Sequence, residues 1–131
     1  MSIEKIFSSK NQLVSIIVRS RFKYKGVKFL TPNNLSQQLG FISYPKNYII
    51  KKHKHRRSLK KVFRTQETLL LLEGVLKVIL YDNKGKLICY KILKKNDIIM
   101  LISGWHEFKI IKKIKMIEVK QGPYSNLDKI Y

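Results

Sequence analysis

Cysteine is almost absent from this sequence. Cys89 is the single one among 131 residues, so no disulfide can form within the chain. It lies in the apolar run LICYKIL (87–93), which is typical of a buried packing thiol. No apolar run reaches the roughly 20 residues that span a membrane, and the start, MSIEKIFSSKNQ, lacks the apolar core of a secretory signal. These absences predict a cytoplasmic protein in a reducing compartment, without a membrane partner.

Acidic residues are scarce as well. Eight Asp and Glu stand against 28 Lys and Arg, for a net charge of +20. Lysine supplies 23 of the positive residues and arginine, which is better suited to guanine and phosphate contacts, only five. Frequent Lys, Ile and Asn indicate a compositional bias of the genome. We therefore expect no specific nucleic-acid partner, only weak salt-sensitive binding and a preference for anionic ligands.

What is present is a series of short apolar or β-branched runs separated by turn residues, over a length typical of one domain. The turn NKG between two such runs is a strong hairpin signal. Weak helical tendency appears only at 3–9 and 34–38. The pattern predicts an all-β antiparallel sandwich or barrel. The expected strands are 13–20, 26–30, 39–44, 47–55, 68–74 (ending in a Glu-Gly turn), 75–82, 86–93, 98–102, 106–111 and 115–120.

All three histidines are candidates for a site. His53 and His55 are two residues apart, so on a strand they point to the same face. His106 begins a later strand, and Glu67 lies between. Three imidazoles and one carboxylate suit a divalent transition metal such as Fe, Mn, Ni or Zn, with positions left open for a substrate. Taken alone, a His-x-His pair is more often solvated surface than a site.

The spacing resembles the two motifs of the cupin superfamily. The first is HxH, a gap, Glu, six residues and Gly, here ending at Gly74. The second is a Gly-Asp-like turn, here Asn96-Asp97, then an apolar strand, a turn and His. The resemblance implies a single cupin domain over residues 1–131, with a jelly-roll barrel of about nine or ten antiparallel strands at about 13–124 and short extensions at both ends. It also implies a homodimer, and His53, His55, Glu67 and His106 as metal ligands.

Four further stretches resemble a subgroup of small bacterial cupins found among genes for surface-polysaccharide and nucleotide-sugar biosynthesis. They are FLTPNNLSQQLGF (29–41), TQE (65–67), ISGWHEF (102–108) and MIEVKQGPY (116–124). In this interpretation Lys54, between the two histidines, faces away from the metal. Residues 56–61 form a charged loop near the barrel mouth, which could contact a phosphate or carboxylate of the substrate.

Other residues are candidates for the same cavity. Glu118 and Lys120 alternate on the last expected strand, so they share a face. If that face is the inner one, Glu118 is a candidate base and Lys120 an anion anchor, both in catalytic roles; a structural salt-bridged pair is equally compatible. Gln38, Trp105 and Tyr124 are candidate substrate-binding residues.

The functional hypothesis is a metal-binding cupin acting on a sugar or nucleotide sugar by isomerase- or epimerase-type chemistry. The alternatives are a non-catalytic sugar-binding module, an Fe(II) oxygenase with the same ligands and, less favoured, a basic nucleic-acid-binding protein. A fold supports many functions, so the site must decide among these.

Overall fold

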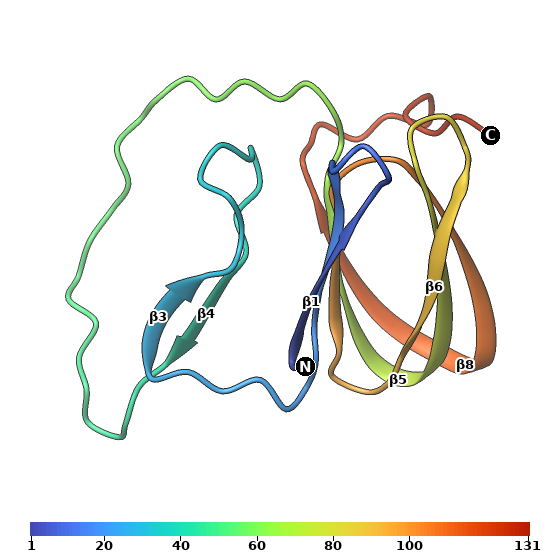
Figure 1. Cartoon of the computed structure of the whole chain (residues 1–131). Helices are drawn as coiled ribbons and strands as arrows, with labels where there is room; N and C mark the ends of the chain where they lie inside the picture. The colour runs from blue at the N-terminus through green and yellow to red at the C-terminus, as the bar shows by residue number, and fades with distance from the viewer. The chain divides into compact units, whose positions relative to one another are not determined.

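The computed structural model describes every residue from 1 to 131 and contains eight strands and no helix. The all-β class predicted from the sequence is confirmed, and no helix could cross a membrane. The chain forms two compact units, a larger one of Met1–Phe22 with Arg64–Tyr131 and a smaller one of Lys23–Phe63 (Figure 1). The single domain expected from the length stays a prediction, because two compact units can still unfold together.

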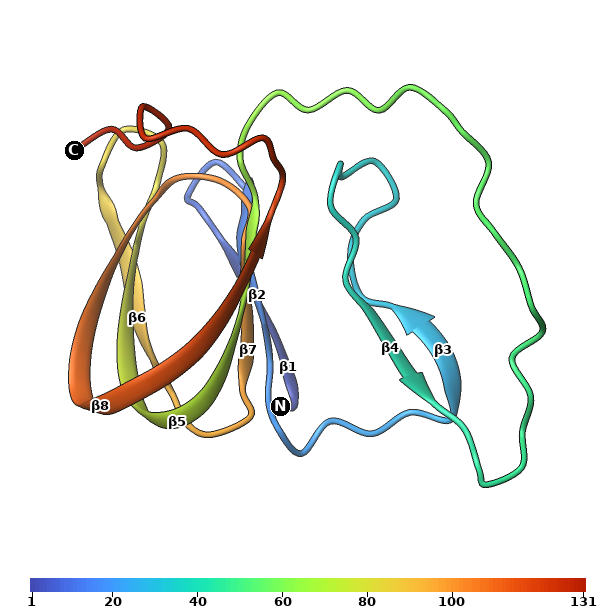
Figure 2. The same cartoon turned by 180° about the vertical axis from the view of Figure 1, so that it is seen from behind.

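The larger unit is a six-stranded antiparallel sheet in the order β1-β2-β7-β5-β6, with β8 paired to β5 along its other edge. In Figures 1 and 2, β5 and β8 bend through a wide curve together. The sheet is therefore a curled half-barrel. Its strands are β1 (Ile3–Phe7), β2 (Leu13–Val18), β5 (Glu67–Tyr81), β6 (Leu87–Leu93), β7 (Ile98–Leu101) and β8 (Trp105–Lys120).

The β5–β8 ladder is irregular around Gly74, in the middle of β5. The β5–β8 register shifts between Leu71 and Leu76, which marks bulges in the ladder. Gly74 lies among them with φ of +91°, and a Cβ there would come within 2.1 Å of the Lys113 carbonyl oxygen. Only glycine tolerates both conditions, and bulges bend a strand and increase its twist.

The predicted turn at Glu73-Gly74 is therefore wrong. A left-handed glycine serves a bulge as well as a turn, so 68–74 and 75–82 form one strand. The two strands expected at 106–111 and 115–120 are likewise one, because β8 follows β5 through the bend.

The inner face of the curl contains the hydrophobic core. Leu69, Leu71, Leu76, Val78 and Leu80 alternate along β5, and each is at most 2% exposed. Side chains of the other strands pack against them, so both halves of the bent strand face one cluster. Burying each such side chain contributes roughly 1.5–3 kcal/mol. The rest of the buried cluster is Ile6, Val14, Ile17, Leu93, Ile99 and Leu101.

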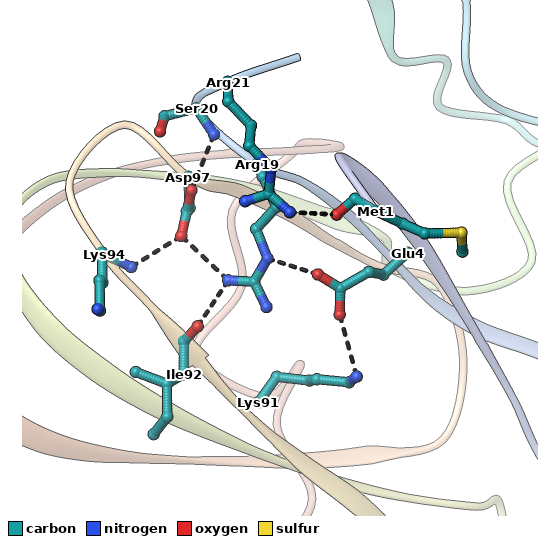
Figure 3. A network of polar contacts seen from close by, with 9 residues as sticks. All are labelled: Met1, Glu4, Arg19, Ser20, Arg21, Lys91, Ile92, Lys94 and Asp97. Atoms are coloured by element: carbon teal, nitrogen blue, oxygen red, sulfur yellow. Dashed lines mark hydrogen bonds and ion pairs between the residues drawn. The ribbon is translucent and has the colours of Figure 1, made fainter.

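A polar network fixes β1 and β2 to the turn between β6 and β7 (Figure 3). Arg19 donates to Glu4 (2.5 Å), to the Ile92 carbonyl (2.6 Å) and to Asp97 (3.1 Å). Asp97 also accepts from the backbone amides of Ser20 and Lys94, both at 2.9 Å. The hydrogen bond from Arg19 outweighs burial and lowers the Glu4 pKa to about 2.

Most of the other expected strands are confirmed. Those at 13–20, 86–93 and 98–102 appear within one or two residues as β2, β6 and β7, and NKG forms the β5–β6 hairpin. The smaller unit contains the other two, paired with each other as β3 (Gly26–Phe29) and β4 (Gly40–Ser43).

Three local predictions are wrong. Residues 3–9 are not helical but contain β1, because pairing with β2 decides against a weak helical tendency. Residues 34–38 form bends and turns, and 47–55 form no strand. No neighbouring strand forms backbone hydrogen bonds with residues 47–55, and the lysines of this stretch repel one another.

We predict that Gly74→Ala lowers the free energy of unfolding by at least about 3 kcal/mol, because it adds a backbone clash to the cost of a left-handed alanine. Gly85→Ala is the matched control. Gly85 has φ of +84° with no atom within 4 Å of an added Cβ, so it should cost only about 1–2 kcal/mol. Urea unfolding of both variants measures the difference, and equal losses would refute the role of the close approach at Gly74.

Candidate functional site

Four of the candidate residues lie on the inner face of the half-barrel. The register pairs Glu67 with Lys120 and Leu69 with Glu118. Paired residues share a face, and Leu69 belongs to the core, so these side chains point inward. His106 pairs with Leu80, another core residue, and shares that face. From the sequence, Glu118 and Lys120 are candidates only if their shared face is the inner one. In the structure it is the inner face.

The bend brings the two ends of the β5–β8 ladder together. Glu67 and Leu80, the partner of His106, are thirteen residues apart on β5, which would be roughly 40 Å on a straight strand. Nevertheless, His106 Nε2 lies 3.9 Å from Glu67 Oε1. The site therefore exists only because the sheet curls at Gly74.

Glu67 and Glu118 form a carboxyl pair. Burial raises the pKa of Glu67 to about 7, and the hydrogen bond and negative charge of Glu118 add to the shift. The same hydrogen bond lowers the pKa of Glu118. Glu67 thus holds the shared proton and donates it to the Glu118 carboxylate, because two carboxylates this close do not both ionise easily. The Glu67 side chain is 16% exposed, so the proton remains accessible.

His106 is a neutral imidazole beside this pair. Burial lowers its pKa, and the positive charge of Lys129 lowers it further, against a smaller opposite effect of Glu118. Its ring lies 5.4 Å from that of Phe108, centroid to centroid. A neutral imidazole beside a carboxylic acid can accept a proton or bind a metal ion.

The C-terminal segment, residues 121–131, folds back toward the site. Thr65 donates to Asp128 at 2.7 Å, and Lys120 Nζ lies 3.9 Å from the same carboxylate. Lys120 also lies 5.8 Å from the ring of Tyr124, which is otherwise exposed. Sequence reasoning missed Asp128 and Lys129. No motif marks them, and only the tertiary fold brings them to the strand ends.

Trp105 and Gln38 are engaged elsewhere. Trp105 precedes His106 on β8, so it points to the outer face, opposite Tyr81, and its Nε1 donates to the Asn83 carbonyl at 3.2 Å. Gln38 belongs to the smaller unit. Its amide accepts from Thr31 (2.6 Å) and donates to the backbone carbonyls of Pro32 and Leu35 (2.8 and 2.9 Å), which stabilises the loop between β3 and β4.

His53 and His55 are exposed and lie outside any strand, so the argument from strand alternation does not hold for them. Their rings nevertheless lie 5.5 Å apart, edge to face, and His53 Nδ1 is 2.8 Å from the Lys51 carbonyl oxygen. Both belong to the smaller unit, whereas Glu67 and His106 belong to the larger one. No three His, Cys, Asp or Glu side chains converge as a metal would require, and the four-ligand set stays a prediction.

No family model, curated protein or solved structure was found to match the chain. The case for a function therefore rests on the carboxyl pair, His106 and the pattern of the sequence.

We predict that Glu67→Gln stabilises the protein increasingly as pH rises from about 4.5 to 7. Unfolded Glu67 loses its proton near the ordinary glutamate pKa of 4.5, and folded Glu67 does so only near 7. Between these pH values the folded protein therefore binds more protons at Glu67 than the unfolded protein does. As pH rises, the wild type loses stability relative to Glu67→Gln, because glutamine does not titrate. The advantage should reach about 1–3 kcal/mol and stay constant above pH 7.

Urea unfolding at steps from pH 4.5 to 8.5 measures this advantage. In a Glu118→Gln background it should shrink, because the negative charge and hydrogen bond of Glu118 contribute to the shift. An advantage independent of pH would show that Glu67 does not hold the proton.

Proposed function

We propose that this chain is a jelly-roll cupin that moves a proton on a small, polar, anionic molecule, with sugars and nucleotide sugars as the substrate class. The chemistry is of the isomerase or epimerase type, in polysaccharide biosynthesis. The observation on which this rests is the Glu67–Glu118 carboxyl pair beside His106 on the inner face, where burial raises the pKa of Glu67 to about 7 and lowers that of His106. Near neutral pH one site then contains an acid and two bases.

The cupin assignment is supported by two independent features. The HxH, Glu and His spacing predicts that Glu67 and His106 meet inside a barrel, and the two lie 3.9 Å apart on the inner face. The curled antiparallel sheet is the architecture from which a jelly roll is built. The homodimer and the cytoplasmic location remain part of the proposal.

Each residue of the site has a proposed role. The Glu118 carboxylate removes the proton from a carbon next to a carbonyl, and Glu67 returns its proton to the neighbouring position or to the other face of the same carbon. Lys120, on the same face, stabilises the negative charge that develops on the substrate oxygen. Burial of Glu67 keeps its proton in place up to about pH 7, while the exposed Glu118 and His106 leave the pair open to a substrate.

A divalent Fe, Mn, Ni or Zn ion fits the chemistry of the donors in part. Neutral His106 and the Glu67 carboxylate are suitable nitrogen and oxygen ligands, and His53 and His55 would complete the set. Such an ion would polarise the substrate carbonyl. Glu67 must first lose its proton, so metal uptake would release one proton and be favoured above about pH 7. In that metal-bound form Glu67 would be a ligand and would no longer be the proton donor.

Solvent exchange tests the proton transfer. With a panel of nucleotide sugars in D₂O, we expect deuterium to enter a carbon-bound position of one substrate, detected by NMR. Glu118→Gln should slow this by about 10²–10⁴-fold, the usual contribution of a general base. The control is Glu107→Gln, whose carboxylate accepts from the Tyr81 hydroxyl away from the site. Saturable binding without exchange would instead identify a non-catalytic sugar-binding module.

Metal content tests the ligand set. Mass spectrometry of untagged protein should find a near-stoichiometric divalent metal, lost in His106→Ala and in His53→Ala. Lys54→Ala, between the two histidines, should retain it. Folded protein that stays metal-free after incubation with Fe(II), Mn, Ni and Zn would exclude the metal-dependent form of the proposal.

A further inference from the structure

The positive charge of this chain is unevenly distributed. All eight acidic residues belong to the larger unit, and none occurs between Glu4 and Glu67. The smaller unit, Lys23–Phe63, contains eleven Lys and Arg and no acidic residue. A bias toward lysine codons raises the charge everywhere, but it does not by itself leave one segment without acidic residues.

The charge is concentrated in residues 46–63, which we name the basic arm. It contains six lysines and two arginines, and every one of its residues is exposed. It has no helix or strand, and its hydrogen bonds are local, such as those from Tyr48 N to Pro45 O and between His53 and Lys51. Neither acidic side chains nor a backbone ladder therefore engage the arm.

The arm also exposes large apolar side chains. Ile49 is 78% exposed, Leu59 101% and Phe63 91%, and Ile50 and Val62 are about half exposed. A solvated basic linker does not need such residues, since each leaves apolar surface in water at about 25 cal/mol per Å². These apolar residues flank the basic residues. The run YII (48–50) precedes KKHKHRR (51–57), and Leu59 and the pair VF (62–63) stand on either side of KK (60–61).

This combination distinguishes between two polyanions. Nucleic acid is bound through arginine and through aromatic rings that stack on bases, and aliphatic side chains gain little from it. Here lysine outnumbers arginine three to one, and most of the exposed apolar side chains are aliphatic. An anionic lipid surface accommodates both kinds, with lysines at the headgroups and aliphatic chains in the acyl boundary.

We propose that the basic arm binds the surface of an anionic lipid membrane. The sequence predicted no membrane partner because no segment is long enough to span one, but an arm that lies on the surface needs no span. Each lysine or arginine close to such a surface contributes about 1 kcal/mol, which falls off within the Debye length. The proposal does not involve Glu67, Glu118 or His106, but the arm contains His53 and His55, the two histidines of the expected metal site.

Vesicle co-sedimentation tests this in 150 mM salt. Full-length protein should bind vesicles of phosphatidylcholine with one third phosphatidylserine, and not phosphatidylcholine alone. Replacing four lysines of the arm, Lys51, Lys52, Lys60 and Lys61, by glutamine should weaken binding by about a hundredfold or more. The matched control, the same change at Lys109, Lys112, Lys113 and Lys115 of β8, removes equal charge and should change binding less than about threefold.

A second variant separates lipid from a general polyanion. Changing Ile49, Ile50, Leu59 and Phe63 to serine leaves the charge intact but should weaken vesicle binding at least about tenfold. Circular dichroism verifies the fold of each variant. The proposal is overturned if the serine variant binds as well as the wild type, if both lysine variants weaken equally, if a single-stranded oligonucleotide binds more tightly than the vesicles, or if no vesicle binds.

Discussion

The pairing of β5 with β8 across Gly74 is the constraint on which the larger unit depends. A side chain at this position would meet the Lys113 carbonyl oxygen at 2.1 Å, so the two strands can bend together only around a glycine. The bend turns both halves of β5 toward one core and brings His106 to Glu67 from the opposite end of the ladder. Fold and site therefore have the same local cause, and a defect at Gly74 would disturb both.

Within this curl, the chemistry of the site depends on which electrostatic effect is larger. A chain with a net charge of +20 should hold its carboxylates ionised, and Lys120 and Lys129 do lower the pKa of Glu67. Burial and the nearby Glu118 act in the opposite direction and are larger, because desolvation is local whereas distant charges are screened. At Glu4 the order is reversed, since a direct hydrogen bond from Arg19 outweighs burial. The same residue type is thus an acid at one site and a permanent anion at the other.

Much of the architecture could be predicted from apolar alternation and turn residues, including the NKG hairpin and the β2, β6 and β7 strands. The errors have physical reasons. The sequence does not distinguish a glycine with positive φ that ends a strand from one that bends it. The residues at 47–55 favour an extended backbone, but no neighbouring strand pairs with them. Of the candidate site, Glu67 and His106 followed from motif spacing. The Glu67–Glu118 pair required the register of strands about fifty residues apart, and Lys129 carries no pattern at all.

The few acidic residues show where the chain needs negative charge. Glu4 and Asp97 neutralise Arg19, Asp82 accepts two backbone amides in the β5–β6 hairpin, Glu107 accepts from Tyr81 and Asp128 accepts from Thr65. With Glu67 and Glu118 in the candidate site, seven of the eight acidic residues have a specific partner. In such a basic chain, acidic side chains occur mainly at positions where they accept hydrogen bonds or form ion pairs. The basic arm has none, so its positive potential stays uncompensated and its apolar side chains stay in water. An external anionic surface would neutralise this positive charge and remove the apolar side chains from water, which is why we assign the arm a partner outside the chain.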